Sequence, residues 1–434
     1  MLKMFHEHIN FEEFTLFDYN TGVLKKISSH EFNSISQTGM IPNHVFQKET
    51  LYSTNKIILF DGPIFSTHTR FPRRIYFQIT RMCNLKCDYC FIKADKNLSH
   101  VPTQDIMKIA NYMGKHGLIE VRLTGGEPTI HPDFFAIIQA FQQNNIYVSI
   151  ATNGLWSTQT LTRLANLENV WIICSLDGDQ ISHNKYRPKT FEKIVTNLAI
   201  LKQTNPRLRL RLTTVLTKEN KKDIFALGKL GKDLQVESIT AIPLRPQVRK
   251  EKIKDQMLTS LDFKEAIQDM LITQEKLGVR FTTTLETQYK NKIHPDPIFR
   301  KKFSCAAGRE GTNLDYNATT EEFVVYACAY SPAVDFDLME EIRRPFVAGK
   351  FKINELEKFK EIWDNEQAWE IYRNLETKYY ECQSCQYYKD NSCTGSCPIQ
   401  NIDFNSFNIK TDMLMQLKDK LAKTAEWYCY KNFL

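Results

Sequence analysis

Between about residue 72 and residue 250 the sequence alternates six strand-like apolar runs with amphipathic stretches of helical periodicity. The runs are 75–79, 119–123, 146–150, 170–176, 208–212 and 239–242, and the stretches between them are 104–116, 132–144, 157–167, 189–204 and 221–231. Strand followed by helix, repeated in this way, predicts a parallel sheet with right-handed crossovers. Six units are too few to close an eight-stranded barrel. We therefore expect an α/β fold built on a partial (β/α)6 TIM-like barrel.

Two further regions flank this barrel. Residues 1–70 contain a predicted hairpin (14–19 and 23–27), a short helix beginning at Ser28 or Ser29, and a strand-like run at 56–60. They predict a small N-terminal α+β extension. We expect the barrel core at 71–250 and a helical linker that completes it at 251–289. Residues 290–434 have weaker periodicity and are expected to form a separate C-terminal domain.

Composition excludes several classes of protein. The chain has 434 residues, of which 42% are hydrophobic and 25% charged, as in an ordinary globular protein rather than a fibrous or disordered one. No run approaches about 18 apolar residues and no secretory signal is visible, so we expect a cytoplasmic protein with no membrane partner. The net charge of +7 is spread along the chain, without the dense basic patch that nucleic-acid binding needs.

The 11 cysteines point to metal chemistry, because a cytoplasmic chain of this size does not need disulfides. Three of them have the spacing Cys83-x3-Cys87-x2-Cys90, just after the first predicted barrel strand. Three thiolates on one loop can hold three corners of a cubane iron–sulfur cluster and leave the fourth iron open. Zinc is the alternative. Zinc sites usually close with four protein ligands, so the spacing favours iron–sulfur.

The loops after the next three predicted strands also carry distinctive motifs. They are Gly125-Gly126-Glu127-Pro128, then Thr-Asn-Gly at 152–154, and Ser-Leu-Asp-Gly at 175–178 followed by 183–187. Together with the cysteine loop and its aromatic residue Tyr89, they resemble the motifs of radical S-adenosylmethionine (SAM) enzymes. Four motifs in the family's order make this resemblance specific.

The resemblance implies a cofactor and a set of binding residues. In that family a reduced 4Fe–4S cluster passes one electron to SAM, whose C–S bond breaks to give a 5′-deoxyadenosyl radical. The three cysteines of the loop would hold the cluster. The motif at 125–128 would bind the methionine amino group of SAM, through Glu127 or through its backbone. Ser175 and Arg187 would contact the carboxylate or ribose, and Asn153 the ribose or adenine. The full set of expected SAM contacts is Tyr89, Gly125, Gly126, Glu127, Pro128, Asn153, Ser175 and Arg187.

Four further cysteines have the spacing Cys382-x2-Cys385-x7-Cys393-x3-Cys397. By itself this spacing is typical of a zinc ribbon, which would leave the other C-terminal cysteines without a role. With them, the arrangement resembles the SPASM extension of radical SAM enzymes, a C-terminal domain that holds two auxiliary clusters. The resemblance implies one cluster on Cys305, Cys328 and Cys397 and another on Cys382, Cys385, Cys393 and Cys429. The chain would then hold three 4Fe–4S clusters.

The chain departs from the SPASM pattern at the first auxiliary cluster. Phe323 stands where the family commonly has glycine, and only three thiolates are evident. Asp315 and Tyr316 are candidates for a fourth ligand, although ordinary structural roles suit both better. Cys174 alternates with Ser175 on a strand. We expect Cys174 to point toward the covering helices as a buried, inert thiol.

SPASM proteins mostly modify peptides or proteins. The resemblance therefore implies a maturase that installs a thioether, carbon–carbon or carbon–oxygen cross-link in a ribosomally made precursor peptide, with flavodoxin or ferredoxin as electron donor. A sulfatase-type formylglycine maturase is a second reading. Those enzymes begin close to their first cluster and tend to have an acidic residue where this chain has Ala329. A non-catalytic iron–sulfur or zinc binding protein is a third. Residues 1–70 would be a leader-peptide recognition module or a packing extension of the barrel.

Overall fold

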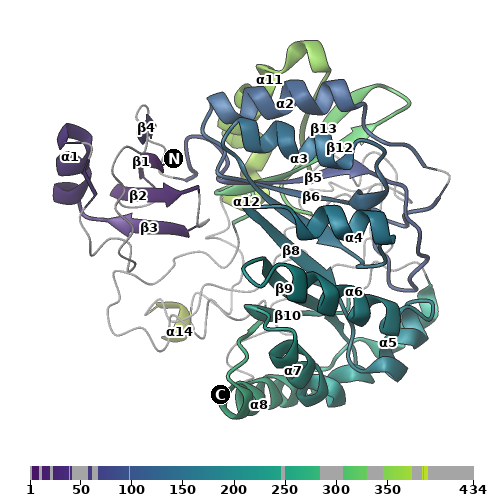
Figure 1. Ribbon diagram of the computed structural model, residues 1–434. Coiled ribbons are helices and arrows are strands. Elements are labelled where there is room, and N and C mark those ends of the chain that lie inside the picture. Colours follow the sequence, from purple (N-terminus) through teal and green to yellow (C-terminus); the bar gives the residue numbers. More distant parts are fainter. Residues whose placement is uncertain are drawn as a thin grey trace.

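The computed structural model is an α/β molecule with one large, mostly parallel sheet and one small sheet (Figure 1). It describes residues 2–8, 12–19, 23–38, 40–41, 57–60, 67–96, 98–245, 250–283, 306–329, 346–373, 384 and 386–389. Five cysteines fall within these ranges, namely Cys83, Cys87, Cys90, Cys174 and Cys328. The other six, all expected as ligands of auxiliary clusters, lie outside the described residues.

Six strands of the large sheet coincide with the six predicted apolar runs. They are β5 (Arg74–Thr80), β6 (Glu120–Gly125), β7 (Tyr147–Thr152), β8 (Val170–Ser175), β9 (Arg209–Leu216) and β10 (Ser238–Pro243). Neighbouring strands are parallel and follow the chain order. The predicted partial barrel is confirmed: in the part of the chain that the structure describes, the sheet stays open, with β11 and β14 at its ends.

The large sheet continues past these six strands on both sides. β11 (Phe281–Thr283) pairs in parallel with β10, and β12 (Gly311–Asn317) pairs in parallel with β5. β13 (Glu322–Tyr326) and β14 (Val347–Phe351) then add antiparallel strands. These four strands were not predicted from the sequence pattern. Strands from beyond residue 290 thus continue the barrel sheet.

Helices cover one side of the large sheet, as the amphipathic stretches predict. The α-helices between β5 and β11 are α2 (Thr103–Lys115), α3 (Phe134–Gln143), α4 (Thr158–Ala165), α5 (Gln180–Tyr186), α6 (Phe191–Thr204), α7 (Ile224–Asp233) and α8 (Ser260–Leu277). Other described helices of the chain are α11 (Lys358–Asp364), α12 (Glu370–Arg373), α14 (Gln386–Lys389), and the 3-10 turns η1 (Pro128–Ile130), η2 (Asn220–Asp223), η3 (Glu251–Gln256), η7 (Ile353–Glu355) and η8 (Glu366–Trp369). Between β5 and β11, α5 replaces a segment that was expected as a loop. No described helix is long and apolar enough to cross a membrane.

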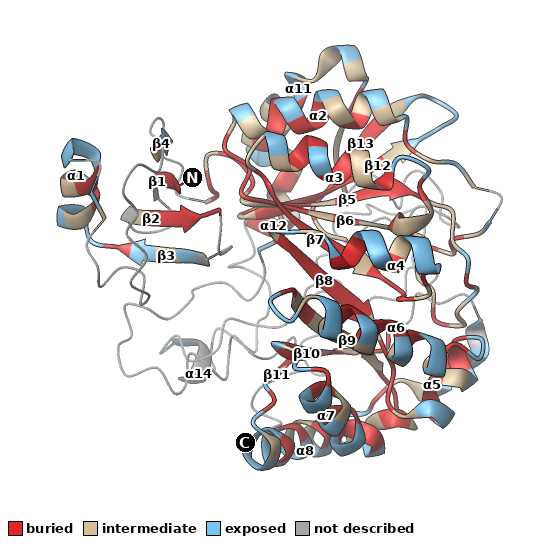
Figure 2. Ribbon diagram, in the orientation of Figure 1, coloured by how far each residue is buried: buried red, intermediate tan, exposed pale blue. Residues whose placement is uncertain are grey.

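The two faces of the barrel strands differ in chemistry, because successive side chains of a strand point to opposite sides. On β9, Leu210 and Leu212 are fully buried in the main core beneath the helices. Arg209 and Arg211 alternate with them and point to the inner face of the sheet. Figure 2 shows the buried strands between the helices. The outer face therefore stabilises the barrel, and on β9 the inner face carries two arginines.

The N-terminal extension is a four-stranded sheet with one helix. Its strands are β1 (Leu2–His8), β2 (Glu12–Asp18), β3 (Val23–Ile27) and β4 (Ile57–Phe60), in the order β3-β2-β1-β4, and its helix is α1 (Ser29–Thr38). The predicted hairpin, helix and fourth strand are confirmed. β1 was missed. One face of the sheet packs on α1 through Leu2, Met4, Leu16, Ile27, Phe32 and Ile35.

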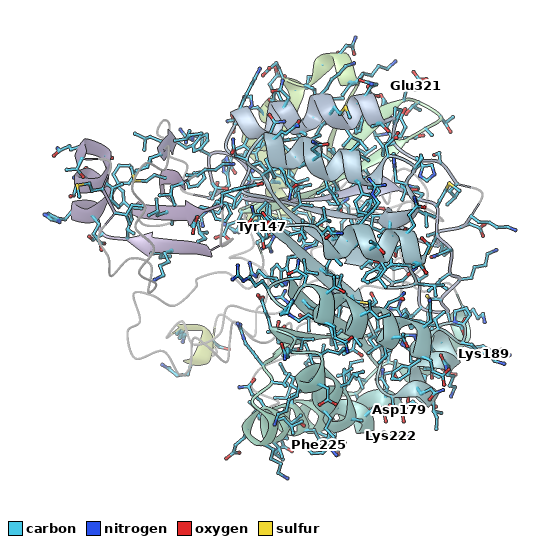
Figure 3. All side chains as sticks on the ribbon, in the orientation of Figure 1. Tyr147, Asp179, Lys189, Lys222, Phe225 and Glu321 are labelled. Carbon is cyan, nitrogen blue, oxygen red and sulfur yellow. The ribbon has the colours of Figure 1, made fainter. Side chains whose placement is uncertain are left out.

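The other face of the N-terminal sheet packs on the barrel. Phe5, Phe17 and Tyr19 form one buried cluster with Ile119, Tyr147, Trp171 and Ile173. Tyr147, labelled in Figure 3, lies on the side of the barrel that faces this sheet. Lys3 is buried there as well; its amine donates to the carbonyl of Leu118, and burial lowers its pKa to about 7. Ile119 immediately precedes β6, and Tyr147 and Trp171 lie at the beginnings of β7 and β8, so the extension covers the end of the barrel opposite the cysteine loop.

Candidate active site

The loop that carries Cys83, Cys87 and Cys90 begins directly after β5. All three thiols are partly exposed, and the backbone N–H of Leu85 donates to Cys83 Sγ at 3.4 Å. Burial raises the pKa of the Cys83 thiol to about 12, with further contributions from Glu127 and from the other two cysteines. The sulfurs of Cys87 and Cys90 are therefore close enough to Cys83 to oppose its ionisation. A bound metal centre would displace their protons and hold them as thiolates.

Gly125 and Gly126, at the end of β6, pack against the chain that leads into the cysteine loop. The N–H of Gly126 donates to Thr80 O at 2.9 Å, and the N–H of Glu127 donates to Met82 O at 2.8 Å. A Cβ at Gly125 would lie 2.0 Å from Thr80 O. A Cβ at Gly126 would lie 2.0 Å from Met82 O. Only glycine allows this approach, which joins the two expected SAM-binding loops.

Glu127 is fully buried and holds the β6 loop to the β7 loop. Its Oε1 accepts from the hydroxyls of Thr129 (2.6 Å) and Thr152 (2.8 Å) and from the N–H of Thr129 at 3.2 Å. Its Oε2 accepts from the N–H of Asn153 at 2.7 Å. Burial raises the pKa of Glu127, while these four donors oppose that shift. Both carboxylate oxygens of Glu127 are therefore engaged within the protein.

Asp177 is the hub of a buried polar cluster beside the cysteine loop. Its Oδ2 accepts from Arg187 Nε at 2.7 Å and from the hydroxyl of Tyr89, and its Oδ1 accepts from the N–H of Val215 at 2.7 Å. The guanidinium of Arg187 also lies 5.3 Å from the centre of the Tyr89 ring. Burial alone would raise the pKa of Asp177, but the charge of Arg187 and these donors hold it below its usual value. The cluster fixes the aromatic residue of the cysteine loop to β8 and β9.

Asn153, Ser175 and Cys174 occupy the ends of β7 and β8. The side chain of Asn153 donates to Asn84 Oδ1 at 2.7 Å, which ties it to the cysteine loop. Ser175 is partly exposed, and its hydroxyl has no hydrogen-bond partner among the described residues. Cys174 is fully buried in the core under the helices, and burial raises the pKa of its thiol to about 12. The orientation predicted for Cys174 is confirmed.

Cys328 is the one expected auxiliary ligand within the described residues. It follows β13 and is partly exposed against the main core. Asp315 and Tyr316, the candidates for a fourth ligand, both lie on β12. The carboxylate of Asp315 is 1% exposed and forms an ion pair with Arg81, two residues before Cys83. This pair connects the hairpin that leads to Cys328 with the first cysteine loop.

The structure brings all eight expected SAM contacts to the end of the strands that bears the cysteine loop. Hydrogen bonds to other residues of the chain hold four of them at this end, namely Tyr89, Glu127, Asn153 and Arg187. The hydroxyl of Ser175 has no hydrogen-bond partner among the described residues. Among the described residues, no group of three Cys, His, Asp or Glu side chains is arranged to hold a single metal ion. A cubane cluster takes each thiolate on a different iron, which fits three cysteines spread along one loop. Asp177 and Thr152 belong to motifs noted in the sequence, but their positioning role was not predicted, and Thr129 and Asn84 were missed.

Two comparisons of sequence place this site among known proteins. Residues 77–230 match the radical SAM superfamily. The AdoMet-dependent heme synthase of Methanosarcina barkeri is 24% identical over 345 residues, which cover 75% of this chain and 91% of the relative. The mycofactocin maturase MftC of Mycobacterium tuberculosis is 25% identical over 334 residues, which cover 75% of this chain and 78% of the relative.

Solved structures share the fold. Streptococcus suis SuiB bound to the precursor peptide SuiA superposes with a TM-score of 0.66 at 17% identity, over 92% of this chain and 94% of that chain. Native anSMEcpe with bound AdoMet and the Cp18Cys peptide superposes with a TM-score of 0.58 at 18% identity, over 82% of this chain and 99% of that chain. The architecture therefore extends beyond the matched domain to most of the chain.

Proposed function

We propose that this chain, a radical SAM protein through residues 77–230, is an enzyme that modifies a ribosomally made precursor peptide. When bound, the cluster and SAM supply the one-electron chemistry that generates a hydrogen-abstracting radical. The chain's own residues position the site. Asp177 holds Tyr89 and Arg187 beside the cysteine loop, Glu127 joins the next two loops, and Ser175 offers a hydroxyl to SAM.

The similarity to SuiB is the observation that carries this proposal. That superposition leaves only 8% of the chain, about 35 residues, unmatched, so it includes part of the N-terminal extension. The SuiB structure contains the bound precursor peptide SuiA, and MftC is a mycofactocin maturase. The N-terminal sheet is a folded unit outside the barrel, and it would offer a second binding surface to a substrate that is a peptide rather than a single residue.

The finer features of the proposal follow the SPASM resemblance. They are a thioether, carbon–carbon or carbon–oxygen cross-link as product, three 4Fe–4S clusters, and flavodoxin or ferredoxin as electron donor. The auxiliary clusters would be held by Cys305, Cys328 and Cys397 and by Cys382, Cys385, Cys393 and Cys429. The N-terminal sheet would recognise the leader of the precursor in addition to packing on the barrel.

A formylglycine maturase is the second candidate. The superposition with anSMEcpe supports it, since it covers 99% of that chain. It leaves 18% of this chain unmatched, however, compared with 8% for SuiB. The larger architecture therefore favours peptide maturation.

The proposal is tested with the anaerobically reconstituted full-length protein, reduced with dithionite and given SAM. We expect 5′-deoxyadenosine, measured by liquid chromatography and mass spectrometry. Replacing Cys83, Cys87 and Cys90 together with Ala should remove this product, because the thiolates that hold the first cluster are lost. Cys174→Ala is the matched control, since its thiol lies in the core, and it should retain SAM cleavage.

The substrate class is tested separately. Co-expression with short open reading frames beside the gene should give a peptide whose mass falls by two hydrogens for each cross-link.

Unchanged SAM cleavage in the triple cysteine variant would contradict the assignment of the site. Oxidation of a sulfatase peptide to formylglycine, without cross-linking of any neighbouring peptide, would favour the second candidate.

A further inference from the structure

The inner face of the barrel sheet holds a layer of polar side chains one step below the expected SAM level. Ser175 of β8 pairs in register with Thr213 of β9, and two residues earlier Ile173 pairs with Arg211. Arg211 also pairs with Ser238 of β10. Because side chains two apart on a strand share a face, Arg211 lies on the same face as Thr213, toward the beginning of the strand. It is thus placed between the SAM site and the N-terminal sheet.

The positive charge of Arg211 is not balanced by a carboxylate among the described residues. Its Nε donates to Ser238 Oγ at 2.9 Å, and its guanidinium carbon lies 4.0 Å from the centre of the Trp171 ring. Among the described residues it forms no ion pair with any carboxylate, and its terminal nitrogens have no acceptor. Trp171 is 8% exposed, and its Nε1 also has no acceptor there. Charges withdrawn from water are ordinarily paired, so this partly buried guanidinium is suited to an external anion.

The neighbouring charges leave the layer positive. Arg74 and Arg122 share the carboxylate of Glu120, and Arg209 is paired with Glu237. Glu120 and Glu237 are thus already paired with three other arginines. Burial, followed by repulsion from Arg122 and Arg74, lowers the pKa of Arg211 to about 10. An anion beside Arg211 would relieve that repulsion.

Partly exposed hydroxyl side chains lie between Arg211 and the expected SAM site. Ser175 and Thr213, directly above Arg211, are partly exposed, and neither hydroxyl has a hydrogen-bond partner among the described residues. Arg211 itself is partly exposed. The opposite end is covered by the N-terminal sheet, which packs on Trp171 and Ile173. A group that binds Arg211 therefore comes from the side where SAM is expected.

We propose that Arg211 binds a carboxylate of the substrate peptide on the inner face of the sheet, below Ser175 and Thr213. The inference rests on the proposed function, since it names a chemical feature of that substrate. A guanidinium binds a carboxylate in a forked, two-bond geometry, which fixes orientation as well as charge. The bound carboxylate would anchor the peptide so that a residue beside it faces the SAM site.

Binding is tested by calorimetric titration of the reconstituted full-length protein, with SAM present, at low ionic strength. The probes are the capped tripeptides Ac-Ala-Glu-Ala-NH2 and Ac-Ala-Gln-Ala-NH2, and Ac-Ala-Ala-Ala with a free C-terminal carboxylate. We expect the two carboxylate peptides to bind more tightly than the Gln peptide. Comparison of the Glu peptide with the free-carboxylate Ala peptide shows whether a side-chain or a terminal carboxylate is preferred.

Arg211→Gln should weaken binding of the Glu peptide by about tenfold or more, because the forked partner is lost. Arg211→Lys should retain part of the affinity, since it keeps the charge without the fork. Arg207→Gln is the matched control: Arg207 is exposed just before β9, so the same charge is removed outside the layer. It should leave the affinity within about twofold.

Equal binding of the Glu and Gln peptides to the unmodified protein would overturn the proposal, and this comparison holds even if Arg211→Gln fails to fold. So would equal weakening by Arg207→Gln. A loss of SAM affinity in Arg211→Gln with unchanged peptide binding would assign the guanidinium to the SAM carboxylate instead. The binding assay needs no turnover. Absence of 5′-deoxyadenosine from the unmodified protein would therefore refute the proposed function without deciding this inference.

Discussion

Asp177 illustrates how one side chain organises the site. The sequence places it in a Ser-Leu-Asp-Gly motif, where its plainest role is to shape a turn. In the structure its carboxylate is 1% exposed and binds Tyr89, Arg187 and the backbone of Val215. No local pattern reveals these partners, because they come from three other segments of the chain. Arg187, expected as a SAM contact, has an internal partner that fixes its position.

Asp177→Asn should therefore be strongly destabilising. The substitution leaves Arg187 buried without its counter-charge, and breaking a buried pair in this way costs about 3–5 kcal/mol. Asp179→Asn is the matched control two residues away: Asp179 caps α5 through Ser182, and Asn caps a helix as well as Asp does. It should cost less than about 1 kcal/mol. Urea unfolding of both variants measures the difference, and similar losses would contradict the role given to Asp177.

At the scale of elements, the site depends on how closely the β5 and β6 loops approach. The Gly125 and Gly126 contacts with Thr80 O and Met82 O leave no room for a side chain. Met82 immediately precedes Cys83, so the second glycine determines where the cysteine loop starts. The glycines of this motif thus have a packing role as well as the expected role in SAM binding.

Gly126→Ala should displace Met82 and with it the first cluster ligand. We expect 5′-deoxyadenosine formation to fall by about tenfold or more, because small misplacements at a reacting centre have large effects on rate. Gly278→Ala is the control. Gly278 ends α8 at φ +71° with no atom within 4 Å of its missing Cβ, so Ala there should cost about 1 kcal/mol of stability and leave the rate unchanged. Retention of full activity by Gly126→Ala would rule out this coupling.

The predicted and missed elements differ in what stabilises them. β5 to β10 were predicted because helices bury their outward side chains, which makes apolar runs such as that of β8 visible in the sequence. β1 was missed because most of its residues are polar. One of them, Lys3, is nevertheless buried, and its amine donates a hydrogen bond to the carbonyl of Leu118. β12 was not predicted because it contains Gly, Asn and Asp, which are depleted in strands. It is stabilised by pairing with β5 on one side and β13 on the other. Of the site, the motif residues were predicted, but the contacts that position them, such as those of Asp177 with Tyr89 and Val215, were not.

At the scale of the whole molecule, the N-terminal sheet and the barrel share a core. Phe17 is 2% exposed and lies in the cluster that contains Tyr147 and Trp171. All five tryptophans of the chain lie outside residues 1–70, so their fluorescence reports on the rest of the molecule. A shared core predicts that the sheet and the barrel unfold together.

Phe17→Ala should lower the stability measured by tryptophan fluorescence in urea by about 3–5 kcal/mol, because it empties a buried aromatic site. Leu24→Ala is the control on the same sheet. Leu24 is 39% exposed on β3, so its loss should cost less than about 1 kcal/mol. An unchanged tryptophan transition in Phe17→Ala would mean that the sheet unfolds independently of the barrel.

The position of the N-terminal sheet sets a length rule for any peptide that it holds. The sheet covers the beginnings of β6 to β8, whereas the cysteine loop lies where β5 ends. The strands between these two ends have six or seven residues, which corresponds to about 20 Å at about 3.3 Å per residue. A peptide anchored on the sheet would need about six or more extended residues to reach the site. Shortening that spacer below six residues would place every modifiable position out of reach, whatever its chemistry.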